Sequence, residues 1–142
     1  MKKVIMSIGN PLRSDDNIGN LVLEKLEKTI HDIKFIKATT NPENFIEPLK
    51  KINPEIIFFI DVAKFEGNIG DVKIFNLEDI IDMHISTHYL PISVFKDYFP
   101  NAKIFLIGIK PKTIDFGENL TPELKQNLPK IIKKIEKIIE SI

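Results

Sequence analysis

The turn between the first predicted strand and the first predicted helix reads Gly9-Asn10-Pro11-Leu12-Arg13-Ser14-Asp15-Asp16-Asn17-Ile18-Gly19. An apolar strand at residues 3–8 leads into this stretch, and a helical pattern over residues 18–30 follows it. Glycine, asparagine and proline end the strand, so two adjacent carboxylates, Asp15 and Asp16, stand directly before the helix. Open α/β sheets bind their ligands at the carboxyl ends of strands. The stretch therefore predicts a strand–turn–helix unit that carries a candidate site.

The rest of the chain alternates short apolar runs with helical patterns. The run at residues 56–60 is apolar throughout, as expected of a central strand buried on both faces, and it ends at Asp61. We expect the last helix to begin at Thr121-Pro122-Glu123, with Thr121 as its N-cap. This alternation predicts an α/β fold with helices on both faces of a mostly parallel sheet. The other predicted strands are residues 34–38, 72–75 and 102–108, and the other predicted helices are residues 43–52 and 90–98.

One connection is too short for a parallel crossover. Only residues 62–71, which include Gly67 and Gly70, separate the third strand from the fourth. A crossover between parallel strands takes roughly a dozen residues or more and usually contains a helix. We therefore expect the strand at residues 72–75 to be antiparallel and to lie at an edge, which makes the five-stranded sheet mixed.

Composition excludes several classes of protein. A chain of 142 residues is expected to form one domain, residues 1–142. Cysteine is absent, which excludes disulfides, zinc–thiolate sites and thiol nucleophiles. The 20 basic and 20 acidic residues balance, so nothing favours a nucleic-acid partner. We expect a soluble, cytoplasmic protein, because the chain has no signal-peptide pattern at its start and no apolar run near the roughly 20 residues that span a bilayer.

Four side chains are expected at the carboxyl edge of the sheet. Asp15 and Asp16 follow the first strand, Asp61 ends the third, and the segment at residues 86–91 can bring His88 to the same edge. Taken singly, each has a common structural role as a helix cap, a turn residue or a hydrogen-bonded loop residue. Together, two carboxylates and an imidazole form a ligand set for a divalent ion with open positions.

Five short segments, in order along nearly the whole chain, resemble the hydrogenase maturation proteases. These endopeptidases trim the carboxyl-terminal extension of the [NiFe]-hydrogenase large subunit. The segments are Gly9-Asn10-x-Leu12-x-x-Asp15-Asp16-x-x-Gly19, Pro42-Glu43-Asn44, Ile60-Asp61-Val62, Thr87-His88-x-x-Pro91, and Gly108-Ile109-Lys110-Pro111 followed by Gly117-Glu118-Asn119-Leu120-Thr121-Pro122-Glu123.

The resemblance implies both a fold and a site. The implied fold is a three-layer α/β/α sandwich with a five-stranded mixed sheet, of the phosphorylase/hydrolase-like kind. The implied metal-binding and catalytic residues are Asp16, Asp61 and His88, in an endopeptidase of aspartic type that activates a hydrogenase. Its partner would be the large-subunit precursor. Nickel would be carried by that precursor as a recognition element and would not be a permanent cofactor of the protease.

Two positions depart from the family's pattern. Asn17 stands where the family usually has glycine, and Ala38-Thr39-Thr40 stands where a Gly-Gly-Thr-like turn is common. Asparagine tolerates a left-handed backbone better than most residues, so we expect the first turn to be preserved. The second departure lies near the expected site and bears on its geometry.

The sequence also restricts the reaction. It contains no Gly-x-Ser-x-Gly and no His-Glu-x-x-His, so neither a serine nucleophile nor an ordinary zinc protease is expected. Attack by water could be assisted by a metal acting as Lewis acid or by a carboxylate acting as base, and the sequence leaves both open.

Two other classes of protein share part of this pattern. A phosphoacceptor receiver domain also has paired acids after its first strand, an aspartate ending the third and a Lys-Pro after the fifth, here Lys110-Pro111. Residues 9–14 separate the first strand from its acids, however, and the expected antiparallel strand does not fit an all-parallel receiver sheet. The other alternative is a flavodoxin-like domain that binds a small anion or flavin without catalysis. No glycine-rich phosphate loop supports nucleotide binding.

Overall fold

The computed structural model describes residues 1–82 and 92–142. In this part of the chain five strands form one sheet in the order β2-β1-β3-β5-β4. The first four strands in that order are parallel to one another, and β4 pairs antiparallel with β5 at the edge. The predictions of a mixed sheet and of an antiparallel edge strand are confirmed. The strands are β1 (Lys3–Ile8), β2 (Lys34–Thr39), β3 (Ile56–Val62), β4 (Val72–Asn76) and β5 (Lys103–Ile109).

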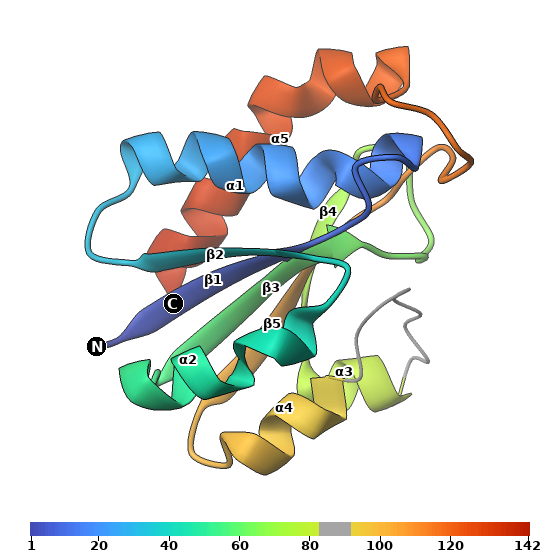
Figure 1. Ribbon diagram of the computed structural model, residues 1–142. Coiled ribbons are helices and arrows are strands. Elements are labelled where there is room, and N and C mark those ends of the chain that lie inside the picture. The colour runs from blue at the N-terminus through green and yellow to red at the C-terminus, as the bar shows by residue number, and fades with distance from the viewer. Residues whose placement is uncertain (83–91) are drawn as a thin grey trace.

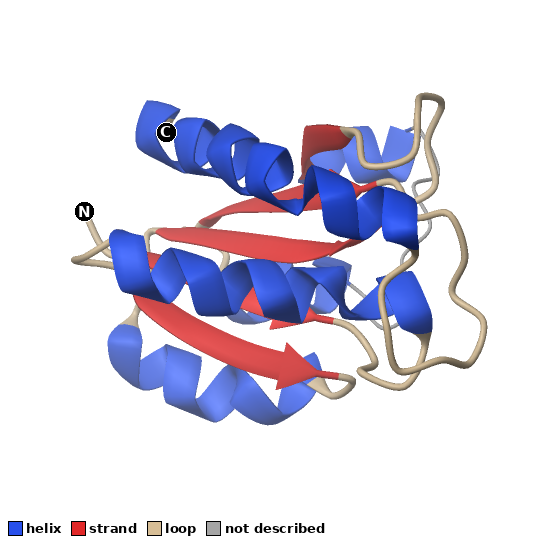
Figure 2. Ribbon diagram, turned by 90° about the horizontal axis from the view of Figure 1, so that it is seen from above, coloured by secondary structure: helices blue, strands red, loops and turns tan. Residues whose placement is uncertain are grey.

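Helices cover both faces of the sheet (Figure 1). The helices α1 and α5 lie together on one face, and α2, α3 and α4 lie on the other. Seen from above, α1 and α5 lie over the sheet and run roughly along the direction of the strands (Figure 2). The three-layer α/β/α sandwich is therefore as predicted. The helices are α1 (Ile18–Thr29), α2 (Ile46–Ile52), α3 (Leu77–Asp82), α4 (Ile92–Tyr98) and α5 (Pro122–Ser141), with 3-10 turns η1 (Ser14–Asn17) and η2 (Pro42–Phe45).

The central strand β3 divides the core between the two faces. Every residue of β3 is buried. Phe58 and Ile60 pack in the cluster formed with α1 and α5, whereas Phe59 packs on the other face, with its ring centroid 5.0 Å from that of Phe95 in α4. Successive side chains of a strand point to opposite faces. The side chain of Asp61 is therefore directed to the face that Phe59 occupies.

Two helices differ from the sequence prediction. The helix predicted at residues 43–52 begins as the 3-10 turn η2, a geometry that is frequent at helix N-termini. Helix α3 was not predicted, because β4 runs into it without a glycine or proline. Its signal was a reciprocal cap: the backbone N–H of Asp79 donates to Asn76 Oδ1 at 2.8 Å, and that of Asn76 donates to Asp79 Oδ2 at 3.2 Å. Among the described residues, no helix is both long enough and apolar enough to cross a membrane.

Candidate functional site

The candidate site lies where the order of the strands reverses. The chain passes from β1 to β2 on one side and then returns to place β3 on the other side of β1. Open α/β sheets have a crevice at such a switch point, outside the carboxyl ends of the two strands. Asp16 in η1 follows β1, and Asp61 is the penultimate residue of β3. The topology thus brings these two predicted site residues to one edge.

Two glycines allow the chain to approach this edge closely. Gly9 has a φ of +153°, and a Cβ atom there would lie 2.0 Å from the carbonyl oxygen of Asp16. A Cβ atom on Gly19 would lie 2.8 Å from the carbonyl oxygen of Ile60 and 3.0 Å from that of Ile8. The first turn of α1 therefore packs directly against the ends of β1 and β3, which holds Asp16 in a buried position, 1% exposed.

The carboxylates of Asp16 and Asp61 are only half satisfied. The backbone N–H of Asn10 donates to Asp16 Oδ2 at 2.9 Å, and that of Val62 donates to Asp61 Oδ1 at 2.7 Å. The remaining oxygens, Asp16 Oδ1 and Asp61 Oδ2, are buried and receive no hydrogen bond from any described residue. A buried acceptor without a partner costs about 1–3 kcal/mol, and more when it is charged. A proton, a cation or a donor bound between them would remove that cost.

The charges of this pair oppose each other. Burial raises the pKa of Asp61 well above its ordinary value, the nearby charge of Asp16 raises it further, and the Val62 N–H lowers it less. Carboxylates in this arrangement resist simultaneous ionisation. The pair is therefore suited to holding a proton or a cation.

Asp15 has a different role from its neighbour. Its Oδ2 accepts the backbone N–H groups of Lys112 at 2.9 Å and Thr113 at 3.3 Å. Its Oδ1 accepts the backbone N–H of Thr121 at 2.7 Å, and the Thr121 hydroxyl lies 2.9 and 3.0 Å from the two carboxylate oxygens. Asp15 therefore fixes the loop after β5 against η1. Thr121 does occupy the N-cap position of α5, but its hydroxyl bonds Asp15 and makes no cap hydrogen bond.

Further bonds join the first loop to the loop after β5. Ser14 donates its backbone N–H to the carbonyl of Gly117 at 2.9 Å, and Gly117 donates its own to the carbonyl of Leu12 at 2.9 Å. Arg13 Nε donates to the carbonyl of Ile114 at 3.0 Å. The two loops therefore form one platform beside the carboxylate pair.

The two departures from the family pattern have different consequences. Asn17 has a φ of −81° and a ψ of −3°, in the right-handed region, so the turn forms here without the left-handed backbone that asparagine tolerates. Its Oδ1 accepts a hydrogen bond from Asn20 Nδ2 at 2.9 Å. Thr39, in contrast, has a φ of +56°, which is unfavourable for a β-branched residue. Of the two departures, it is therefore the one at residues 38–40 that places a non-glycine residue in a conformation that favours glycine.

One buried residue that the sequence analysis did not single out supports the site. Asn20 in α1 is 2% exposed, accepts the Ser7 hydroxyl at 2.9 Å and donates to the carbonyl of Gly9 at 3.0 Å. It therefore positions the turn in front of Asp16. The sequence does hint at this role, because Asn20 is a polar residue on the apolar face of a predicted helix.

The third predicted ligand, His88, lies outside the described residues, so a three-residue site stays a prediction. Within the described ranges, no group of three or more histidine, aspartate or glutamate side chains could hold a metal ion. Lys110, the candidate lysine of a receiver-type site, donates its ammonium to the carbonyl of Gly67 at 2.8 Å. The antiparallel β4 also departs from the all-parallel order 2-1-3-4-5 of flavodoxin-like sheets. Neither alternative class is favoured.

Comparison with known proteins gives a consistent result. The family model for hydrogenase maturation proteases matches residues 21–138. A putative hydrogenase maturation protease of Methanocaldococcus jannaschii is 40% identical over 153 aligned residues, covering 99% of this chain and 90% of the relative. The hydrogenase 3 maturation protease of Escherichia coli is 24% identical, covering 96% and 90%. The crystal structure of a [NiFe] hydrogenase maturation protease from Thermococcus kodakarensis superposes with a TM-score of 0.80 at 28% identity, covering 98% of this chain and 92% of that one.

Proposed function

The chain belongs to the hydrogenase maturation protease family, and on that premise we propose that it removes the carboxyl-terminal extension of a [NiFe]-hydrogenase large-subunit precursor. One observation carries the proposal to particular residues. Asp16 and Asp61 are buried side by side at the switch point of the sheet, and each has one oxygen without a donor among the described residues. With no cysteine and no Gly-x-Ser-x-Gly motif to supply a covalent nucleophile, the expected nucleophile is water, and a carboxylate pair is suited to activating it.

We assign nickel to the substrate. The precursor would present it, and Asp16 Oδ1, Asp61 Oδ2 and the imidazole of His88 would hold it. Carboxylate oxygen and imidazole nitrogen are both ligands of Ni(II), and Asp16 Oδ1 and Asp61 Oδ2 have no donor among the described residues. Binding the metal would fix the scissile peptide beside the pair. Such positioning can lower a barrier by up to roughly 7–11 kcal/mol in the best intramolecular cases.

The pair also supplies acid–base chemistry. Burial, and then the charge of Asp16, raise the pKa of Asp61, so in the metal-free protein Asp61 holds its proton to a higher pH than an ordinary aspartate does. That proton would leave when the pair holds the metal, and an ionised carboxylate could then take a proton from the attacking water and return it to the leaving amine. When bound, nickel would supply Lewis-acid polarisation of the scissile carbonyl.

The test uses the nickel-loaded large-subunit precursor from the same organism and its metal-free form. Intact mass after incubation reports any lost carboxyl-terminal peptide. We expect cleavage of the nickel-loaded form alone. Cleavage of both forms would contradict recognition of the metal while leaving the peptidase, and cleavage of neither form by the wild-type protein would contradict the proposed function.

Variants connect the activity to the pair. Asp16→Asn and Asp61→Asn keep the shape of the side chain and remove the charge, so we expect both to lose processing. Asp97→Asn on α4 is the matched control, because Asp97 is exposed and lies on a surface helix. Normal cleavage by Asp16→Asn would remove Asp16 from the site.

A further inference from the structure

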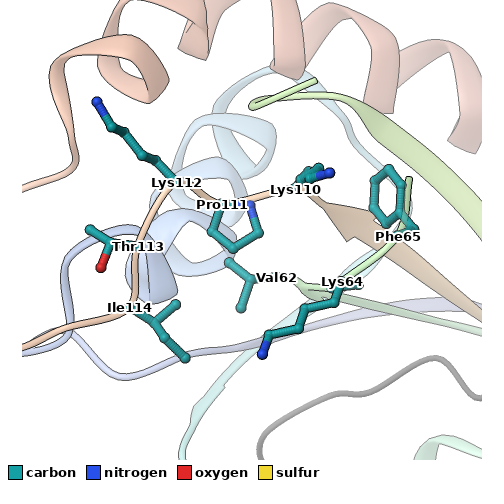
Figure 3. A pocket seen from close by; sticks show the side chains of 9 residues that line it. Val62, Lys64, Phe65, Lys110, Pro111, Lys112, Thr113 and Ile114 are labelled. Carbon is teal, nitrogen blue, oxygen red and sulfur yellow. The ribbon is translucent and has the colours of Figure 1, made fainter. Parts of the chain in front are cut away.

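A pocket begins one residue beyond the carboxylate pair. Its volume is about 340 Å³, at the lower end of the range of ligand pockets. One wall is formed by residues 62–65 at the end of β3, and the other by residues 110–114 after β5 (Figure 3). Val62, whose N–H bonds Asp61 Oδ1, is part of the first wall. The pocket is therefore within reach of a peptide whose backbone lies at Asp61.

The lining combines apolar surface with positive charge. Val62, Phe65 and Ile114 are among its apolar residues, and the charged residues that line it in the described part of the chain are three lysines. Two of these ammonium groups are engaged: that of Lys112 pairs with Glu123, and that of Lys110 donates to the carbonyl of Gly67.

The third ammonium group belongs to Lys64, and it forms no ion pair with any described residue. Lys64 is exposed, and its side chain runs beneath Val62 toward Ile114, whereas Lys112 points away from them (Figure 3). A ligand in the pocket would therefore meet one unpaired cation beside an apolar wall.

The walls are fixed without a ligand. The backbone N–H of Ala63 donates to the carbonyl of Ile109 at 3.1 Å, and that of Lys110 donates to the carbonyl of Asp71 at 3.0 Å. Asp15 holds the N–H groups of Lys112 and Thr113. A site built in advance loses little conformational entropy on binding.

We propose that this pocket is a specificity subsite, which takes an apolar side chain of the precursor segment next to the scissile bond and pairs an adjacent acidic side chain of that segment with Lys64. The inference rests on the proposed function, since it places the scissile bond at Asp16 and Asp61. An extended peptide advances about 3.3 Å per residue, so a position one or two residues from the scissile bond reaches the pocket. Charge complementarity favours an acidic neighbour, because the described residues that line the pocket include three lysines and no acidic residue.

Steady-state cleavage of the nickel-loaded precursor tests the subsite. Lys64→Glu should raise KM about three- to tenfold and leave kcat within about twofold, because an exposed ion pair aids binding of substrate and transition state alike. Ile114→Trp should fill the pocket and raise KM by about tenfold or more. Lys133→Glu, a charge reversal at an exposed position of α5, is the control and should change neither constant.

A charge swap identifies the partner of Lys64. Each acidic residue within about four positions of the scissile bond is replaced by lysine in turn. One of these precursors should be cleaved by Lys64→Glu with a restored KM and by the wild-type protein with a raised one. KM values within about twofold of wild type for both Lys64→Glu and Ile114→Trp, or no restoring precursor, would overturn the subsite.

Amide chemical shifts separate failure of the subsite from failure of the proposed function. A synthetic peptide spanning the cleavage site is added to the isotope-labelled protein, which requires no cleavage. Shifts at residues 63–65, 110 and 112–114 support the pocket even if no precursor is processed. Shifts confined to other segments, or none at millimolar peptide, contradict it even if processing is normal.

Discussion

Asp15 and Asp16 are adjacent in the chain, yet both oxygens of Asp15 are hydrogen-bonded while Asp16 Oδ1 has no donor among the described residues. The first carboxylate is therefore part of the framework, and the second is available for chemistry. This difference leads to opposite expectations for the same substitution at the two positions.

Asp15→Asn should destabilise the protein strongly. The new amide nitrogen would replace one carboxylate oxygen and would face either the N–H groups of Lys112 and Thr113 or that of Thr121, so those hydrogen bonds would be lost. Hydrogen bonds to a charged group are worth about 1.5–3 kcal/mol each. We expect a loss of about 3 kcal/mol in the free energy of unfolding, measured by urea denaturation. Asp16→Asn should be as stable as wild type or more stable, because it relieves the charge opposing Asp61. Equal losses in both variants would contradict the division of roles.

The stability of the protein should depend on pH through Asp61. In the folded protein its pKa is raised, chiefly by burial and then by Asp16, so the unfolded chain releases this proton at a lower pH than the folded chain does. Between the ordinary value of 3.8 and the raised value, the folded state binds more protons. The free energy of unfolding contributed by this group therefore falls as pH rises through that window, and is level above it.

Asp61→Asn removes this dependence. Its stability relative to wild type should increase as pH rises from about 4 to about 8, in urea titrations with a chelator present. A relative stability that stays constant over this range would show that the pKa of Asp61 is not raised.

Thr39→Gly tests the strained turn after β2. A β-branched residue at a φ of +56° is held in an unfavourable conformation that costs on the order of 1–2 kcal/mol, which glycine avoids. Glycine also adds about 0.5–1 kcal/mol of backbone entropy to the unfolded state. We expect Thr39→Gly to unfold at or slightly above the wild-type temperature. Thr40→Gly bears only the entropic cost and should unfold at a lower temperature.

Gly19→Ala tests the close approach of α1 to the sheet. Alanine is preferred over glycine in a helix by about 1 kcal/mol, so propensity alone predicts a gain. The added Cβ atom would lie 2.8 Å from the carbonyl oxygen of Ile60, and relief requires α1 to move away from the ends of β1 and β3. We expect a lower melting temperature and slower processing. A more stable variant would show that α1 can move away from the sheet without loss of stability.

The sequence predicted β1, β3 and β5 well because each is a short apolar run with a glycine or an aspartate at its end. Residues 56–60 are apolar throughout, and the short connection after them implied the antiparallel strand β4. It predicted the edge at which Asp16 and Asp61 meet for the same reason: the carboxyl ends of neighbouring parallel strands share one edge.

The sequence could not distinguish Asp15 from Asp16 except through the family resemblance. The bonds that define Asp15 come from residues 112–121, about a hundred positions away, and local patterns carry no information on such contacts. The conformation of Thr39 was hidden similarly, because it follows from the register shift between β1 and β2 at residues 7 and 8. The pocket beside Lys64 needs two segments that meet only in the folded sheet.

The bond from Thr121 to Asp15 joins positions 106 residues apart. During synthesis, Asp16 leaves the ribosome early, but its neighbour receives this clamp only after Thr121 has also emerged. The turn that carries Asp16 therefore gains this clamp only once residues 112–121 have folded against it.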